Sequence, residues 1–219
     1  MADTKASATS MKAMPCIHLN GFPGTGKLTI ARKLVEKINT GAEKDEPNNG
    51  SGSQTRAKLV HNHLLIDPAG AVLDRTQPGY QQLRKAIREA VFTSLVNEKS
   101  TYETIYVFTD WQSGDDVGSG VCEDFQTMAK ARGSLFIPIL ITCDEKENVR
   151  RIQGAGRAVL STKVTDPGLL LQWRQEVNPP PVYQFRDHKA RLEVDVTSLS
   201  AEQAAEVILK HASQYVPVW

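Results

Sequence analysis

The chain has 219 residues, a length that suits one α/β domain. Charged residues make up 23% and the formal net charge is +1, so bulk charge favours neither nucleic acid nor a membrane surface. No apolar run reaches the roughly 20 residues that a membrane helix needs, and residues 1–14 lack the apolar core of a secretory signal. We therefore expect a cytoplasmic protein with a disordered tail over residues 1–14 and a single domain over residues 15–219.

The first third of the chain begins with an apolar run over residues 16–20, which predicts a strand. A glycine-rich turn over residues 21–26 follows it. Apolar residues then recur at helical spacing from Lys27 to about Lys37, which predicts a helix. Residues 41–57 are dense in Gly, Ser, Asn and charge without periodicity, so we expect a flexible insertion there.

The middle of the chain repeats this alternation. A second strand is expected to begin at Leu59 and to run through His61 and His63 into an acidic loop at Asp67. An amphipathic helix is expected over residues 79–99, because apolar residues recur there at four-residue steps. The next apolar run predicts a third strand that ends at Asp110.

The last part of the chain adds two more strands. A helix that stops at Gly133, a buried strand and an Asp144-capped helix come first, followed by an irregular, basic stretch over residues 154–168. The remaining elements are expected at residues 169–177 (helix), 192–196 (strand) and 200–212 (helix). Such alternation predicts an α/β fold with a five-stranded parallel sheet and helices on both faces.

The turn after the first strand carries the strongest functional signal. Its glycines permit positive φ angles that aim backbone N–H groups at an anion, and the following helix N-terminus adds partial positive charge. A lysine at the end of the turn would reach the β- and γ-phosphates. The plain alternative is a glycine-rich turn without a ligand. The residues expected to bind nucleotide are Gly21, Phe22, Pro23, Gly24, Thr25, Gly26, Lys27, Leu28 and Thr29.

One position departs from the general phosphate-loop pattern. That pattern has Ser or Thr directly after the lysine, where the hydroxyl contacts Mg²⁺, whereas this chain has Leu28 there and Thr29 one place later. Successive helical residues point about 100° apart, so Thr29 does not replace the missing hydroxyl. This argues against a Ras-like or motor-type ATPase site.

The shifted threonine instead matches another family. The sequence from Gly21 to Thr29 resembles the pattern Gly-x-Pro-Gly-x-Gly-Lys-x-Thr of the adenylate kinases, which are nucleoside-monophosphate kinases. The resemblance implies a three-layer P-loop NTPase fold with a short lid, ATP as the nucleotide, and Mg²⁺ held largely through water. It also implies that the last strand and helix, residues 193–200, border the adenine.

Polar residues end the second and third expected strands, and ligands bind beyond the carboxyl ends of such strands. Asp110 could organise Mg²⁺ through water or assist the attacking hydroxyl, or it could cap a turn. Trp111 follows it where a motor ATPase would have a glutamate. Asp67 could be the general base, or an ordinary Asp-Pro turn residue.

The histidines and the following arginine are candidates for acceptor binding. Alternation on a strand would put His61 and His63 on one face, where they could bind an acceptor, ligate zinc or simply pack. Shikimate-kinase-like enzymes, which the chain also resembles, carry acidic residues at this place. Arg84 is a candidate for an anionic acceptor, its alternative being a solvated helix face.

The resemblance implies a lid over the irregular stretch of residues 154–168, with Arg151 just before it and Arg157 within it. The segment Arg151-Ile152-x-Gly154 resembles the entry to the adenylate-kinase lid, and Arg157 resembles its phosphate-facing arginine at a shifted spacing. Guanidinium groups there would stabilise charge on the transferred phosphoryl group. The alternative for each is a surface charge.

Together these residues predict a kinase that transfers the γ-phosphoryl group of ATP to a small hydroxylated or nucleotide-like acceptor. Lys27, Asp67, Asp110, Arg151 and Arg157 would be catalytic. The alternative is a nucleotide-binding protein without phosphotransfer that acts as a regulator or partner. We expect ATP and Mg²⁺ as cofactors, a small-molecule acceptor, no nucleic acid or membrane as partner, and a monomer or homodimer.

Overall fold

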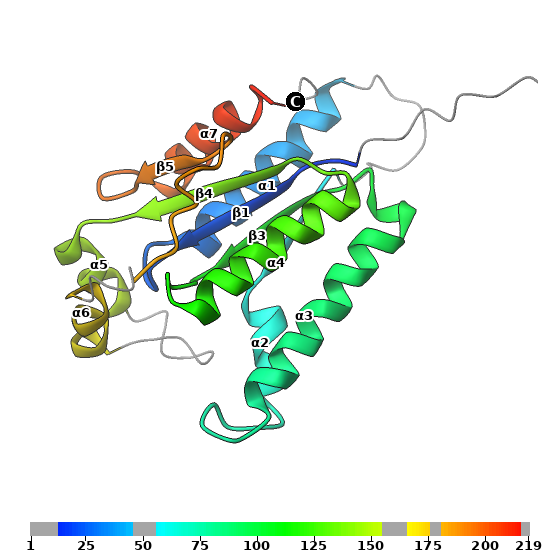
Figure 1. Ribbon diagram of the computed structural model, residues 1–219. Helices are drawn as coiled ribbons and strands as arrows, with labels where there is room; N and C mark the ends of the chain where they lie inside the picture. Colours follow the sequence, from blue (N-terminus) through cyan, green and yellow to red (C-terminus); the bar gives the residue numbers. More distant parts are fainter. Residues whose placement is uncertain (1–12, 46–55, 155–165, 176–180, 216–219) are drawn as a thin grey trace, which may run out of the picture.

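A computed structural model describes residues 13–45, 56–154, 166–175 and 181–215 of the chain. Its centre is a parallel sheet of five strands in the order β2-β3-β1-β4-β5 (Figure 1). Each crossover places a helix on one face, so both faces are covered and the five-stranded α/β prediction is confirmed. The strands are β1 (Cys16–Gly21), β2 (Ala57–His61), β3 (Ile105–Asp110), β4 (Phe136–Thr142) and β5 (Leu192–Asp195).

The helices form two layers around this sheet. On one face α1 and α7 pack against the side chains of Ile17 and Leu19, and on the other face α3 and α4 pack against Cys16 and its neighbours. This division follows from the strand period of two, because successive β1 side chains point to opposite faces. The helices are α1 (Lys27–Asp45), α2 (His63–Gly70), α3 (Tyr80–Asn97), α4 (Asp116–Arg132), α5 (Glu145–Ile152), α6 (Pro167–Gln175) and α7 (Ala201–Ala212), with a 3-10 turn, η1, at Lys99–Thr101.

Several helix ends lie where the sequence signals predict. Gly133 caps α4 with a left-handed φ of 72°, and Asp144 caps α5 by accepting from the N–H of Glu147. Ser200 begins α7 with a reciprocal capping box to Gln203. None of the helices in the described ranges is both long and apolar enough to cross a bilayer.

The boundaries of two expected segments differ from the structure. Helix α1 continues to Asp45, so the start of the segment expected as a flexible insertion is helical, and Ala57 at its end already belongs to β2. Ala13 is buried and the N–H of Met14 donates to the carbonyl of Tyr102, so the end of the expected tail packs on the domain. Residues 1–12 and 46–55 lie outside the described residues.

The region after β2 corrects the prediction of one long strand. The strand ends at His61 and Asn62 begins helix α2, whose first turn is closed by N–H bonds from Leu65 and Ile66 to the carbonyl of Asn62. Burial of the α2 apolar face against the rest of the domain overrides the local turn preference of the Asp67-Pro68 pair. His61 and His63 therefore do not alternate along one strand.

Candidate functional site

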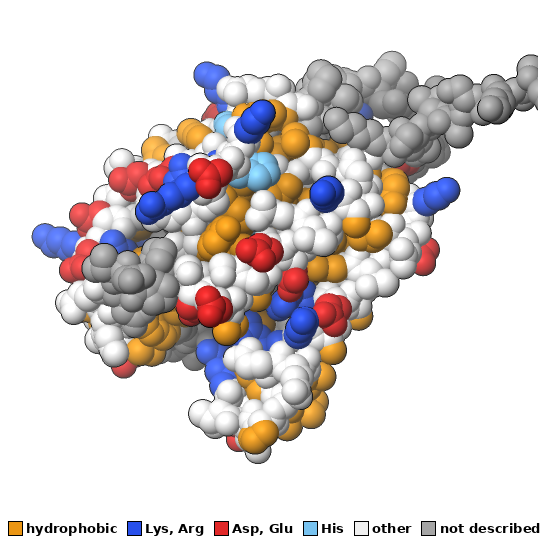
Figure 2. All heavy atoms as spheres, viewed as in Figure 1, with side chains coloured by type: hydrophobic (Ala, Val, Ile, Leu, Met, Phe, Trp, Pro, Cys, Tyr) orange, Lys and Arg blue, Asp and Glu red, His pale blue; other side chains and the backbone are white. Residues whose placement is uncertain are grey.

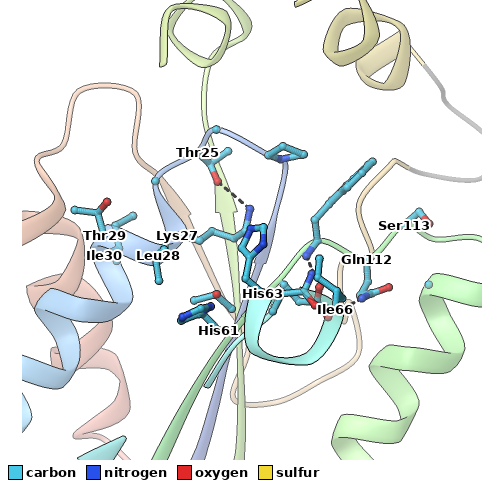
Figure 3. A pocket seen from close by; sticks show the side chains of 18 of the residues that line it. Thr25, Lys27, Leu28, Thr29, Ile30, His61, His63, Ile66, Gln112 and Ser113 are labelled. Carbon is cyan, nitrogen blue, oxygen red and sulfur yellow. Dashed lines mark hydrogen bonds between the residues drawn. The ribbon is translucent and has the colours of Figure 1, made fainter. Parts of the chain in front are cut away.

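A pocket of about 790 Å³ lies at the carboxyl ends of the strands (Figure 3). One end is formed by residues 23–29, which are the turn before α1 and the start of that helix, and the other by residues from β2, α2, α3 and the end of β3. This is the edge of the sheet at which open α/β folds bind ligands. The pocket brings together most of the predicted site residues: Lys27, His61, His63, Arg84, Asp110 and Arg151. Asp67 does not line it, and Arg157 lies outside the described residues.

The turn before α1 has the conformation that its glycines predict. Gly24 and Gly26 adopt φ angles of 90° and 89°, which other residues rarely take. Gly21 is required for a different reason, because a Cβ there would lie 2.3 Å from the carbonyl oxygen of Ile141 on the neighbouring strand. The hydroxyl of Thr25 donates to the carbonyl of Phe22 at 2.9 Å and closes the turn. The loop is therefore compact and tightly set against β4.

Lys27 begins helix α1 with its ammonium group folded across this loop. Nζ lies 2.6 Å from the carbonyl oxygens of both Gly21 and Phe22 and 3.4 Å from Oγ1 of Thr25 (Figure 3). Leu28 and Thr29 follow on the helix and also line the pocket. The cation is thus held where the phosphates of a nucleotide would approach the loop.

Helix α5 supports the loop through two of its side chains. The side-chain amide of Asn148, which is fully buried, donates to the carbonyl of Pro23 at 2.9 Å. Arg151 donates to the carbonyls of Thr25 and Val196 at 3.3 and 2.8 Å, and its Nε bonds Glu147 at 2.7 Å. Arg151 therefore links the loop to the connection between β5 and α7. Its expected role at the transferred phosphoryl group stays a prediction.

Asp110 ends β3 in a buried position between the loop and α4. Its Oδ1 accepts from the N–H of Trp111 at 2.8 Å and its Oδ2 accepts from Nε2 of Gln112 at 2.6 Å. Burial raises the pKa of Asp110, while these two hydrogen bonds and the charges of Arg84 and Lys27 oppose the rise. With one lone pair of each oxygen already used, the carboxylate suits a Mg²⁺ ion held through water.

The residues beside Asp110 form a polar and aromatic wall that the sequence did not single out. The side chain of Asn20 accepts from the N–H of Gln112 and donates to the carbonyls of Gln112 and Tyr183. Trp111 packs on Trp173 of α6, with ring centroids 4.4 Å apart, and on Phe22 of the loop at 6.3 Å. Only the order of elements could have suggested these contacts, because the partners are distant in sequence.

His61 and His63 remain neighbours despite the change of element between them. Their ring centroids are 6.2 Å apart, and both rings line the pocket. Nδ1 of His63 lies 3.1 Å from Oδ1 of Asp67, one turn further along α2. Among the described residues no three His, Cys, Asp or Glu side chains gather as metal ligands, so the zinc interpretation gains no support.

Arg84 places a half-buried guanidinium group in the wall opposite the loop. Its Nη1 donates to Gln81 at 3.2 Å, and the group lies 5.7 Å from the ring centre of Tyr80. Its Nε is buried and has no hydrogen-bond partner within the described part of the chain. Arg32 and Arg75 also line the pocket. Arg84 thus lines a pocket that is rich in cations, and its expected role at the acceptor stays a prediction.

Comparison with known proteins gives structural matches alone, since no protein-family model and no curated protein matches the sequence. A gluconokinase from Sinorhizobium meliloti is similar with a TM-score of 0.58 at 13% identity, over 93% of this chain and 94% of that one. A shikimate kinase from Bacteroides thetaiotaomicron matches with a TM-score of 0.54 at 14% identity, over 93% and 98%. An APS kinase from Mycobacterium tuberculosis, in complex with AMPPNP and APS, matches with a TM-score of 0.55 at 12% identity, over 92% and 98%.

The fold is that of the P-loop kinases. The strand order, the parallel sheet and the glycine-rich loop before α1 all belong to this P-loop kinase fold. The site also fits the nucleotide that the fold implies, because the loop carries a positively charged side chain and the pocket has the volume of a small-molecule site.

Proposed function

We propose that the protein is an ATP-dependent phosphotransferase that moves the γ-phosphoryl group to a small hydroxylated or nucleotide-like acceptor. The observation that carries the proposal is a single pocket with the phosphate loop at one end and His61, His63 and Arg84 at the other. Transfer between two bound molecules requires both within one enclosure, aligned and shielded from water. The small-molecule kinases among the structural neighbours support the same class of reaction.

The nucleotide half of the proposal uses the loop and the connection after β5. Loop N–H groups and Lys27 would hold the β- and γ-phosphates. Val196 and Leu199 line the same pocket and would border the base. Mg²⁺ would be held by water near Asp110, where it neutralises charge on the phosphate oxygens.

The acceptor half follows from the charges in the pocket wall. The buried Nε of Arg84 gains a partner if an oxygen of the acceptor binds there, and an unsatisfied buried donor is costly. A guanidinium group recognises carboxylate or phosphate through two parallel hydrogen bonds. We therefore infer an acceptor that carries an anionic group as well as the hydroxyl that is phosphorylated.

A second candidate function is nucleotide binding without phosphotransfer. His61 at the end of β2 and His63 at the start of α2 stand where shikimate-kinase-like enzymes have acidic residues, and this difference favours a changed or absent acceptor reaction. The two candidates share the nucleotide site and differ only in turnover.

The deciding experiment incubates the protein with Mg·ATP and a pooled small-metabolite extract and measures ADP that depends on the extract. Acceptor-dependent ADP supports the phosphotransferase, and ATP binding without it supports the binding protein. Lys27→Ala should weaken ATP binding under both candidates, because the loop loses its cation. Lys33→Ala is the matched control, since Lys33 lies on α1 outside the pocket and pairs with Glu36. Unchanged ATP affinity in Lys27→Ala would refute the phosphate site.

The anionic acceptor is tested by Arg84→Gln in the same assay. We expect the concentration of extract that gives half-maximal ADP formation to rise about tenfold or more, while the KM for ATP stays unchanged. Lys85→Gln on the next, exposed position of α3 is the control. Equal behaviour of the two variants would count against an anion at Arg84.

A further inference from the structure

We propose that His63 is the general base of the phosphoryl-transfer step and that Asp67 is a positioning residue that fixes the orientation and tautomer of His63. The proposal rests on the phosphotransferase function proposed above. It replaces the prediction that Asp67 itself takes the proton.

The two side chains form an aligned pair at the start of α2. His63 and Asp67 are four residues apart, a spacing that puts them on one side of the helix. Nδ1 of His63 and Oδ1 of Asp67 are 3.1 Å apart. A carboxylate only accepts hydrogen bonds, so this contact places the ring proton on Nδ1 and the lone pair on Nε2. Nε2 is the atom that would take a proton.

The placement of the pair gives each residue a different role. His63 lines the pocket, and Figure 3 shows its ring extending from the start of α2 toward the part of the pocket that holds Lys27. The Asp67 side chain is 45% exposed and does not line the pocket, so in this proposal it acts on the acceptor through His63. A base held by a second group is a common arrangement in sites that activate a hydroxyl.

Asp110, the other candidate base, is less suited to proton abstraction. Both of its oxygens already accept hydrogen bonds from Trp111 and Gln112. Those bonds fix the carboxylate at the end of β3 and occupy a lone pair on each oxygen, so the group is not free to turn toward an acceptor hydroxyl. This geometry suits a group that orders water around Mg²⁺.

The proposed step balances as follows. Nε2 of His63 takes the proton from the acceptor hydroxyl, and the oxygen lone pair forms a bond to the γ-phosphorus of ATP. The bond between the γ-phosphorus and the β–γ bridging oxygen breaks, and ADP leaves with that electron pair. The imidazolium, stabilised by the carboxylate of Asp67, then returns its proton to solvent.

The tautomer is tested without any acceptor. The protein is labelled with ¹⁵N-histidine, and the His63 ring signals are assigned by their loss in His63→Gln. We expect the Nδ1–H form in the protein as isolated, and a shift toward the Nε2–H form in Asp67→Asn. The proposal would be overturned if His63 of the unaltered protein were in the Nε2–H form. It would also be overturned if the ¹⁵N signals of the His63 ring were the same in Asp67→Asn as in the unaltered protein.

The base role is tested with Mg·ATP and the pooled metabolite extract. His63→Ala is expected to lower acceptor-dependent turnover about 100-fold with little change in the KM for ATP, since a general base contributes about 10² to 10⁴. Added imidazole should restore part of the rate. Asp67→Asn should lower turnover by a smaller factor and leave the KM for ATP unchanged. Glu89→Gln is the control and should leave turnover unchanged, because Glu89 is an exposed carboxylate on α3 that does not line the pocket.

The outcomes separate the two proposals. Normal turnover in His63→Ala leaves the phosphotransferase intact and overturns the base. Absence of acceptor-dependent ADP in the unaltered protein overturns the phosphotransferase and the base role with it, while the tautomer measurement still decides whether Asp67 orients His63.

Discussion

The side-chain amide of Asn148 donates a 2.9 Å hydrogen bond to the carbonyl oxygen of Pro23, which is 125 residues earlier in the chain. The Oδ1 of Asn148 in turn accepts from Nη1 of Arg174 at 3.0 Å. The Arg174 guanidinium group also lies 5.2 Å from the ring centre of Phe22. Helices α5 and α6 thus hold the loop before α1 through one buried amide.

Asn148→Ala removes both hydrogen bonds and should loosen the loop. We expect the Kd for Mg·ATP to rise about 5- to 10-fold, the equivalent of one hydrogen bond, with a small fall in Tm. Binding is measured by calorimetric titration. Lys146→Ala is the control, because Lys146 is exposed on the same helix. Equal affinities of the two variants would mean that the loop holds its shape without Asn148.

Two glycines of α4 should respond in opposite directions to alanine. A Cβ at Gly118 would lie 2.3 Å from the carbonyl oxygen of Ser113, whereas a Cβ at Gly120 meets nothing within 4 Å. Gly118→Ala should therefore destabilise the fold and displace the segment that carries Gln112. Gly120→Ala should stabilise it by about 0.5–1 kcal/mol, because alanine favours the helix. Chemical denaturation of both variants checks the prediction, and a shift of the same sign would contradict it.

His18 should make folding sensitive to acid. Its ring is fully buried, stacks on Phe125 with centroids 4.3 Å apart, and has no hydrogen-bond partner for either nitrogen in the described ranges. Burial, with a smaller effect of the Lys27 charge, lowers the pKa of His18 from 6.5 to about 3. Below pH 6.5 His18 therefore binds a proton in the unfolded chain but not in the folded protein. The free energy of unfolding falls as the pH falls from 6.5 toward 3.

The size of this effect is about 1.4 kcal/mol for each pH unit below 6.5. His18→Phe keeps an aromatic ring on Phe125 and removes the titration. The free energy of unfolding of the variant should fall less steeply between pH 7 and about pH 5 than that of the unaltered protein. The free energies are measured by urea denaturation at each pH. If they fall equally steeply with pH in His18→Phe and in the unaltered protein, His18 is not the group that makes folding sensitive to acid.

Arg132 should be essential for stability although it is charged and buried. Its guanidinium group is 1% exposed and donates to the carbonyls of Leu95 and Thr104 and to Thr101, between the rings of Tyr102 and Tyr106. Arg132→Met should lower the free energy of unfolding by about 3 kcal/mol, since it leaves buried carbonyls without donors. Lys130→Met, exposed on the same helix, should change it little. Similar unfolding midpoints of Arg132→Met and Lys130→Met would refute the stabilising role of Arg132.

The sheet and the loop were predictable because their causes are local. Apolar runs of strand length, helical periodicities and the spacing from Gly21 to Thr29 are properties of short segments. The predicted boundaries of helices and strands were wrong where tertiary packing, and not the local sequence, determines the structure. Helix α2 begins at His63 and contains an Asp-Pro pair, both of which suggested another structure locally, and it buries Leu65, Ile66 and Ala69 against the rest of the domain.

The site could be predicted only in part for the same reason. Lys27, Asp110 and Arg84 could be placed from the order of strands and helices along the sequence, and all three line the pocket. The pairing of His63 with Asp67 depends on α2 and could not be inferred from a strand. The support from Asn148 joins segments 125 residues apart, for which the sequence offers no spacing rule.

The contact between Trp111 and Trp173 joins the pocket wall to helix α6 through two indole rings. Because indole emission depends on its surroundings, a nucleotide that enters beside Trp111, or any displacement of α6, will change the intrinsic fluorescence of the protein. The same pair of tilted indole rings thus supplies a built-in optical signal, with which ligand entry can be timed without a dye.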